Sequence, residues 1–221
     1  MPRYTAVELR KLWKPRLLEH GFKCKSYFSR DVGNLQEILG FQRNLHNRTV
    51  RVNLQITLRD EFRNPPTNFV VLMGALARDQ ALLGRDFWWE EDELSNSVEC
   101  AVRYALPFLE YYSNPTNLIP LFERGVEHKC QISALVNPPS PPMPKRFLFS
   151  RPSENLPVHV PPSHYHVLSL LYYYDGRVSE SCENAKKYLE ALGQGRFGGE
   201  PERTLRQLAV MGCTGSSHKP H

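Results

Sequence analysis

The strongest constraint on the fold is an alternating run between Arg48 and Arg59. The run reads RTVRVNLQITLR, and apolar residues occupy every second position from Val50 to Leu58. Successive side chains of a strand point to opposite faces of a sheet, so the run predicts a strand with one buried face and one polar face. The polar face would carry Thr49, Arg51, Asn53, Gln55, Thr57 and Arg59.

Two further strands are predicted before this run. The segments 22–30 and 34–43 are rich in strand-forming residues and are bounded by turn residues. Connections this short join antiparallel neighbours, so the three segments predict a meander. Thr5 and Glu8 form a capping box that begins a predicted helix over 5–20, and this helix would cover one face of the sheet.

The next part of the chain predicts more helix. The apolar piece at 70–77 fits either a strand or a short helix. Apolar residues at helical spacing predict a helix over 91–112, kinked at Pro107, and a shorter helix from Thr116. We therefore expect an α+β domain over 1–136, in which helices cover an antiparallel meander of three or four strands.

Proline separates this domain from the rest of the chain. Nine of the 18 prolines fall in residues 137–163, which predicts an extended connector, because proline disrupts helices and central strands. Residues 164–212 predict a helical hairpin that is similar to one repeat of the tetratricopeptide type, with a turn at Asp175 and Gly176. Residues 213–221 predict a disordered tail.

Charge is divided unevenly along the chain, whose net charge is +5. Residues 1–59 hold 12 basic residues (Lys and Arg) and 4 acidic residues (Asp and Glu). Residues 60–136 hold 6 basic and 12 acidic residues. The two segments either screen each other or leave a basic patch exposed for an anionic partner. No apolar run is long enough to span a membrane, and the N-terminus lacks the apolar stretch of a signal peptide.

The cysteines and other reactive residues form no known motif. The five cysteines are widely spaced, which indicates reduced thiols and a cytoplasmic location. His159, His164 and His166 have no nearby Cys or carboxylate to complete a metal site, and the acidic run at 86–93 is explained by a helix dipole. We therefore expect no metal and no cofactor. A protein without enzymatic activity is the main hypothesis, and an enzyme whose site is assembled from scattered residues is an alternative.

One segment resembles a known family. It reads LLEHGFKCKSYFSRDVGNLQEILGFQRNLHNRTVRVNLQI and includes Gly21 and Phe22, Tyr27, Arg30, Gly33, Phe41 and Gln42, and the triplet from Val52 to Leu54. Over residues 9–56, the chain resembles an uncharacterised, mostly bacterial family of small cytoplasmic α+β proteins, classed as a domain of unknown function. The later FWW and LPFLEYY segments look like the helical second half of that family. Members often carry glycine where this chain has Gln55. The resemblance implies a fold and no activity.

The polar sheet face is the candidate binding surface. We expect the chain to act by binding another protein, for example by neutralising a toxin or masking its partner, because Arg and Tyr are favoured interface anchors. A nucleic-acid-binding protein that uses a basic sheet face is the alternative. The oligomeric state is not predicted. The predicted contact residues are Lys23, Lys25, Tyr27, Gln42, Arg43, Arg51, Asn53, Gln55, Arg59, Trp88 and Trp89.

Overall fold

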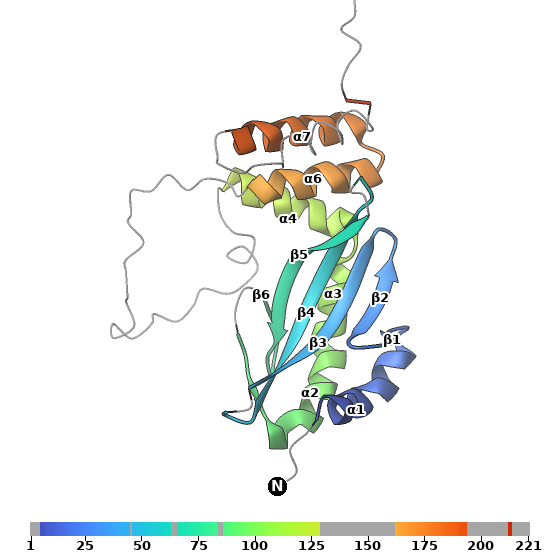
Figure 1. Ribbon diagram of the computed structural model, residues 1–221, viewed down its shortest axis with the longest axis vertical. Coiled ribbons are helices and arrows are strands. Elements are labelled where there is room, and N and C mark those ends of the chain that lie inside the picture. The colour runs from blue at the N-terminus through green and yellow to red at the C-terminus, as the bar shows by residue number, and fades with distance from the viewer. Residues whose placement is uncertain are drawn as a thin grey trace, which may run out of the picture. The chain divides into compact units, whose positions relative to one another are not determined.

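The computed structural model (Figure 1) describes residues 5–44, 46–62, 66–83, 86–128, 162–193 and 212–213. The chain divides into two compact units, residues 1–118 and residues 119–221. Most of the predicted connector, 137–163, and of the predicted tail, 213–221, lies outside the described residues. The domain boundaries that we expect from the sequence therefore stay predictions.

The first unit begins with helix α1 (Ala6–Glu19), which confirms the predicted N-terminal helix. The backbone N–H of Glu8 donates to the Thr5 hydroxyl (3.2 Å), and the Thr5 N–H donates to the Glu8 carboxylate (2.5 Å). The predicted capping box is therefore present. On the inner side of α1, Trp13 is fully buried and packs edge-on against Phe41, with 5.2 Å between the ring centroids.

An antiparallel sheet of seven strands follows α1. Its order is β1-β2-β3-β4-β5-β6, and β7 pairs with β4. The piece at 70–77 belongs to a strand, so the helix alternative is wrong. The strands are β1 (Lys23–Cys24), β2 (Phe28–Val32), β3 (Leu35–Asn44), β4 (Thr49–Asp60), β5 (Thr67–Leu76), β6 (Ala81–Leu83) and β7 (Trp89–Glu90).

The first predicted strand, 22–30, is wrong as a single element. A bend at residues 25–27 divides it into β1 and β2, and the N–H of Lys25 donates to the carbonyl of Tyr27 across this bend (3.0 Å). The chain folds back there, so that Cys24 pairs with Phe28. The hairpin turn between β2 and β3 lies at Gly33 and Asn34, and Gly33 has the positive φ (+58°) that glycine readily adopts.

The predicted helix over 91–112 is interrupted. It consists of a 3-10 turn (Glu91–Glu93), α2 (Leu94–Cys100), a π-helical turn (Ala101–Ala105) and α3 (Leu106–Tyr112). Pro107 lies in the first turn of α3, where the lack of a backbone N–H costs the least helix stability. The wide π-helical turn comes directly before α3. The predicted shorter helix is present as α4 (Pro115–Glu127), which spans the boundary between the two units.

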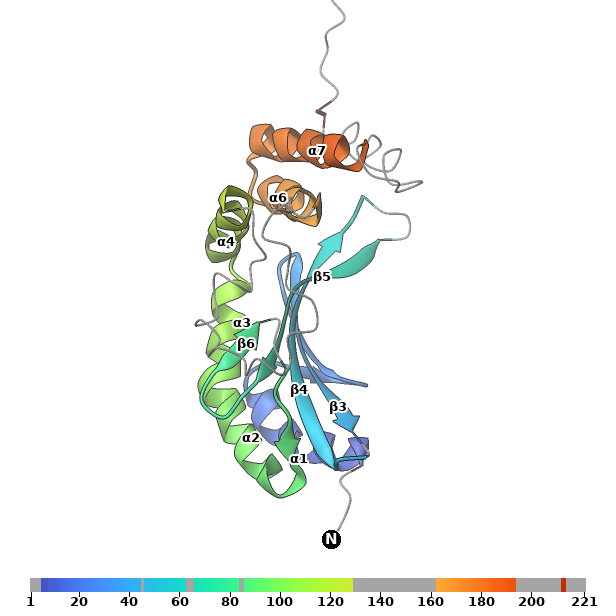
Figure 2. The same cartoon turned by 90° about the vertical axis from the view of Figure 1, so that its left-hand side faces the viewer.

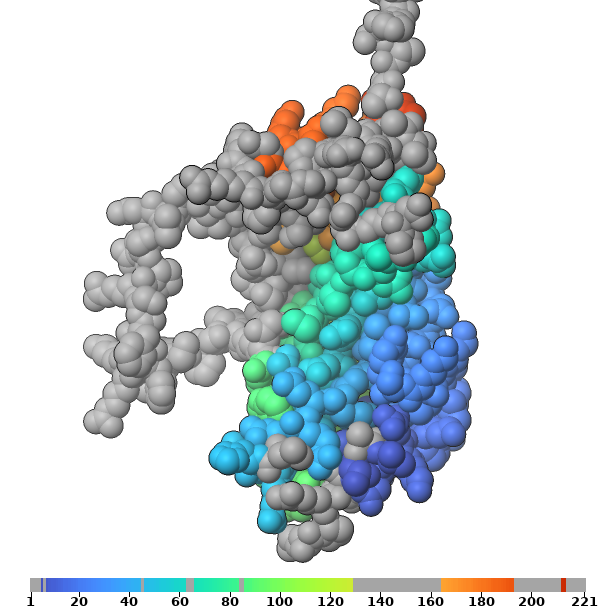
Figure 3. All heavy atoms as spheres, in the orientation of Figure 1, coloured from blue at the N-terminus to red at the C-terminus, as the bar shows by residue number. Residues whose placement is uncertain are grey.

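The helices of the first unit cover only one face of the sheet (Figure 2). The covered face of β4 carries its alternating apolar residues from Val50 to Leu58, all of which are buried. We call the opposite side the open face. In the space-filling view, atoms of β2 to β5 form much of the visible surface on this side (Figure 3). By strand register, the open face carries Lys23, Ser29, Asp31, Gln36, Ile38, Gln42, Arg51, Asn53, Gln55, Thr57, Arg59, Asn68, Val70 and Met73.

The second unit contains the predicted helical hairpin, α6 (Pro162–Tyr174) and α7 (Val178–Gly193). The turn lies at Asp175 and Gly176, as the sequence predicts, and Gly176 has a positive φ of +79°. The Ser181 hydroxyl donates to the carbonyl of Ser169 (2.6 Å) and ties the two helices together. None of the described helices has the length and hydropathy needed to cross a bilayer.

The expectation that all cysteines are reduced is wrong for one pair. Cys182 in α7 forms a disulfide with Cys213, and their Cα atoms are 5.4 Å apart. Cys24 and Cys100 are free thiols. The bonded pair is separated by 31 residues, and a spacing this long matches no short motif from which a pairing could be predicted.

Candidate partner-binding surface

The structure places a subset of the predicted contact residues on the open face. On β4, the alternation that the sequence shows is confirmed, because the apolar phase is buried and the polar phase lies on the opposite side. On β3, Gln42 pairs with Arg51 and belongs to the same side. The residues brought together in this way are Lys23, Gln42, Arg51, Asn53, Gln55 and Arg59.

Besides the two tryptophans, three predicted residues do not lie on this face. Arg43 follows Gln42 in the same strand and pairs with the buried Val50, so it points to the covered side. Two consecutive strand residues cannot share a face, and placing Arg43 beside Gln42 was therefore wrong. Lys25 and Tyr27 lie in the bend between β1 and β2, where they are exposed but belong to neither face of the sheet.

The two tryptophans have different surroundings. Trp89 pairs with Val50 through β7 and is only 1% exposed. Its indole N–H donates to the carbonyl of Leu76 (2.8 Å). Trp89 is therefore a core residue, and the prediction that it contacts a partner is wrong. Trp88 is half-buried, so a part of its side chain is accessible.

Sequence reasoning missed the apolar part of the open face. Val70 and Met73 of β5 are 47% and 52% exposed. Val70 pairs with Thr57, and Met73 pairs with Gln55, whose amide nitrogen lies 3.8 Å from the Met73 sulfur. Because the piece at 70–77 fits both a strand and a helix, its side chains could not be assigned to a face from the sequence.

The cations of the open face are each close to a carboxylate. Lys23 lies 3.2 Å from Asp31, and Gln36 also donates to Asp31 (2.7 Å). Hydrogen bonds from Gln36 and Lys23 lower the pKa of Asp31, so its carboxylate stays ionised at neutral pH. The other two pairs are Arg51 with Asp86 (2.5 Å) and Arg59 with Glu61 (3.4 Å). The face is therefore polar and nearly balanced in charge, unlike the basic face that the sequence suggests.

A hollow lies on the open face at the end of the β2–β3 hairpin. Its volume is about 590 Å³. The hollow crosses β2, β3, β4 and the start of β5, and its lining includes Asp31, Gln36, Thr57, Arg59 and Asn68. Asp31, Gln36, Arg59 and Asn68 offer a carboxylate, a guanidinium and amides, which suit hydrogen bonds to the main chain and polar side chains of a protein. Thr57 is buried, and its hydroxyl donates to the carbonyl of Gln36 (3.5 Å).

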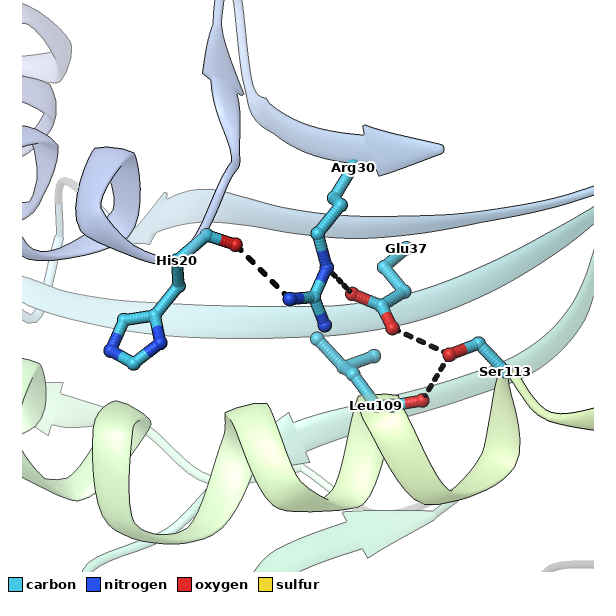
Figure 4. A network of polar contacts seen from close by, with 5 residues as sticks. All are labelled: His20, Arg30, Glu37, Leu109 and Ser113. Atoms are coloured by element: carbon cyan, nitrogen blue, oxygen red, sulfur yellow. Dashed lines mark hydrogen bonds and ion pairs between the residues drawn. The ribbon is translucent and has the colours of Figure 1, made fainter. Parts of the chain in front are cut away.

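A buried ion pair lies on the covered side of the sheet (Figure 4). The Glu37 side chain is 0% exposed, and Arg30 Nε donates to one of its carboxylate oxygens (2.8 Å). The Ser113 hydroxyl lies 2.5 Å from the other Glu37 oxygen and 2.7 Å from the carbonyl of Leu109. Arg30 also donates to the carbonyl of His20 (3.0 Å). This network connects α1, β2, β3 and the end of α3.

A second hollow, of about 440 Å³, adjoins this ion pair. Glu37, Ser113 and Glu110 are among its lining residues, which include neither His nor Cys. Since Arg30 already neutralises Glu37, we interpret the ion pair as a structural contact that joins β2 and β3 to the end of α3. The sequence signal for Glu37 was its position between Leu35 and Leu39 in the buried phase of β3, where a carboxylate needs a counter-ion.

Two of the three histidines considered as metal ligands, His164 and His166, are buried in the second unit. His164 packs edge-on against Phe122, at 5.3 Å between ring centroids, and His166 stacks on Tyr188 at 4.8 Å. His159 lies outside the described residues. Within the described ranges, no three His, Cys, Asp or Glu side chains gather in a way that could hold a metal ion.

We expect His164 to make the second unit sensitive to acid. Within the part of the chain that the structure describes, neither of its ring nitrogens has a hydrogen-bond partner, and burial lowers the pKa of this imidazole below its ordinary value of 6.5. Because the pKa of His164 is lower in the folded chain than in the unfolded chain, the unfolded chain binds the proton more readily below pH 6.5. The folded state therefore keeps its full stability above pH 6.5 and loses part of it as the pH falls through the lowered pKa. We expect His164→Phe to reduce the loss of thermal stability between pH 7.5 and pH 5.5, measured by circular dichroism. An equal loss in both proteins would contradict this assignment.

Comparison with protein-family models, with curated proteins and with solved structures found no match to this chain. The family resemblance that we infer from residues 9–56 therefore stays a prediction. The α+β fold is established by the structure itself.

Proposed function

We propose that this chain acts by binding another protein through the open face of its sheet. The observation that supports the proposal is the pair of exposed apolar residues, Val70 and Met73, beside a polar hollow on a sheet face that the described helices leave uncovered. Apolar contact area next to polar groups is the composition of a protein interface. Masking of the partner is one form of this function, since it requires the surface alone.

The charges on the open face favour a protein over a nucleic acid. Binding to phosphates depends on cations that can exchange their counter-ions. Lys23, Arg51 and Arg59 each have a carboxylate partner within the chain, and Arg51 is largely buried. Proteins that bind single strands also stack bases on aromatic side chains, whereas no residue assigned to the open face is aromatic.

The test is affinity capture from a native lysate with matched variants. Met73→Glu places a carboxylate in the proposed contact area and should weaken binding about tenfold or more, because an unpaired charge would be buried there. Val178→Glu is the control, since Val178 is exposed to a similar extent on α7 of the second unit. We expect the wild type and Val178→Glu to retain the same protein in stoichiometric amount after nuclease treatment, and Met73→Glu to lose it.

Two outcomes would contradict the proposal. Retention of the same protein by Met73→Glu would show that the open face is not the contact surface. Capture of material that disappears with nuclease would favour the alternative of a nucleic-acid-binding protein.

A further inference from the structure

Three of the predicted contact residues that do not lie on the open face, Lys25, Tyr27 and Arg43, are found near α1. The side chain of Arg10 in α1 reaches the carbonyl of Ser26 (3.4 Å), within the bend that carries Lys25 and Tyr27. Figure 1 shows α1 and β1 close together. In the first turn of α1, hydrogen bonds from Thr5 lower the pKa of Glu8, and the charges of Lys11 and Arg43 act in the same direction. Arg43 therefore lies within electrostatic range of the start of α1.

The outer side of α1 combines lysines with exposed apolar residues. Val7, Lys11, Lys14 and Leu18 follow the i, i+4, i+7, i+11 spacing of one helix stripe. All four are exposed, and Val7 and Leu18 are 52% and 47% exposed. The opposite stripe, from Leu9 to Leu17, is buried against the sheet. We define the α1 patch as this outer stripe together with nearby residues of α1, the β1–β2 bend and β3. It consists of Val7, Arg10, Lys11, Lys14, Leu18, Lys25, Tyr27 and Arg43.

The cations of the α1 patch differ from those of the open face. Among the described residues, no ion pair is formed by Arg10, Lys11, Lys14, Lys25 or Arg43. In contrast, Arg16 on the same helix lies 3.5 Å from Glu19 and 3.6 Å from Glu99. The Glu8 carboxylate lies within electrostatic range of Lys11 and Arg43, and Asp31 lies within range of Lys25, but in the described part of the chain neither forms an ion pair with these cations. The five cations leave the patch with a net positive charge, which is complementary to an acidic surface.

We propose that the α1 patch binds an acidic segment of a partner protein, with apolar side chains of that segment against Val7 and Leu18. A phosphate backbone would use the cations and gain little from two aliphatic side chains. A helix that lies on a membrane inserts its apolar face, whereas the apolar face of α1 is buried in the core. The proposal goes beyond the open face, because it assigns a second surface with its own partner chemistry.

The experiment uses the full chain and three fluorescent probes. The probes are a helical peptide of repeated Glu and Leu, a single-stranded oligo-dT, and vesicles that contain phosphatidylserine. Lys11→Glu/Lys14→Glu reverses the charge of the patch. Lys186→Glu/Lys187→Glu, on exposed positions of α7, makes the same change in net charge elsewhere. Val7→Ser/Leu18→Ser removes the apolar part and keeps the charge.

The expected result has three parts. The acidic peptide binds the wild type, and the α1 charge reversal weakens binding about tenfold or more, while the α7 control changes it about twofold or less. Val7→Ser/Leu18→Ser weakens peptide binding as well. Circular dichroism verifies that each variant is folded, and Lys11→Gln/Lys14→Gln replaces the charge reversal if that variant unfolds.

Several results would overturn the proposal. Equal losses of peptide affinity in the α1 and α7 charge-reversal variants would mean that the net charge of the protein alone attracts the peptide. Tighter binding of oligo-dT or of vesicles than of the peptide would assign the patch to another class of partner. An unchanged peptide affinity in Val7→Ser/Leu18→Ser would remove the argument for a protein segment. None of these results depends on Met73, so they are separable from failure of the open-face proposal.

Discussion

Trp89→Ala is expected to lower the free energy of unfolding of the first unit by about 3 to 5 kcal/mol, the range found when large buried side chains are truncated. The Trp89 side chain is 1% exposed and packs edge-on against Phe87, at 5.3 Å between ring centroids. Its replacement leaves a cavity and removes the hydrogen bond to the carbonyl of Leu76, which then lacks that donor. Chemical denaturation followed by far-ultraviolet circular dichroism measures the change.

The neighbouring tryptophan provides the control. Trp88 is half-buried, so Trp88→Ala removes less buried area and should cost about 1 kcal/mol. Trp89→Phe fills most of the volume of the indole and removes its hydrogen bond. Its loss in free energy of unfolding should therefore lie between those of Trp88→Ala and Trp89→Ala. Similar losses for Trp88→Ala and Trp89→Ala would contradict the different surroundings that we assign to the two residues.

Glu37→Ala is expected to destabilise the first unit by about 3 kcal/mol, at the lower end of the range for a broken buried ion pair. The change leaves Arg30 without its counter-ion beneath the sheet, and the Ser113 hydroxyl loses an acceptor. The lower end of the range applies because the Arg30 side chain is 25% exposed, so water partly solvates the guanidinium that remains. Denaturation curves of the variant and the wild type give the difference.

An exposed ion pair of the same sheet is the comparison. Lys23→Met removes one partner of a pair in which both side chains are largely exposed, so its effect should be about 0.5 kcal/mol or less. Arg30→Met/Glu37→Leu removes both buried charges and should recover much of the loss caused by Glu37→Ala. If Glu37→Ala were as mild as Lys23→Met, the pair would not be buried in the way described.

The features that were predictable from the sequence are those encoded by neighbouring residues. The polar and apolar phases of β4 follow from its period of two, and the start of α1 follows from Thr5 and Glu8, which are three residues apart. The same local signals predict the turn at Gly176. The antiparallel order of β2, β3 and β4 follows from the short connections between them.

The features that were missed depend on residues distant in sequence. Trp89 is in the core because β7 pairs with the start of β4, about forty positions earlier, and no local pattern predicts that pairing. The disulfide between Cys182 and Cys213 is of the same kind. For the candidate surface, the polar residues of β4 were predictable, whereas Val70 and Met73 required knowledge of which side of β5 is covered.

The position of the buried ion pair has a consequence for how the strands find their alignment. Arg30 and Glu37 are direct cross-strand partners in the ladder between β2 and β3. A slip of this hairpin by one residue would turn one of the two side chains toward solvent and leave the other charge alone against the helices. Misaligned pairings would therefore be penalised while the hairpin forms, so a pair that adds little net stability can still select one alignment among several.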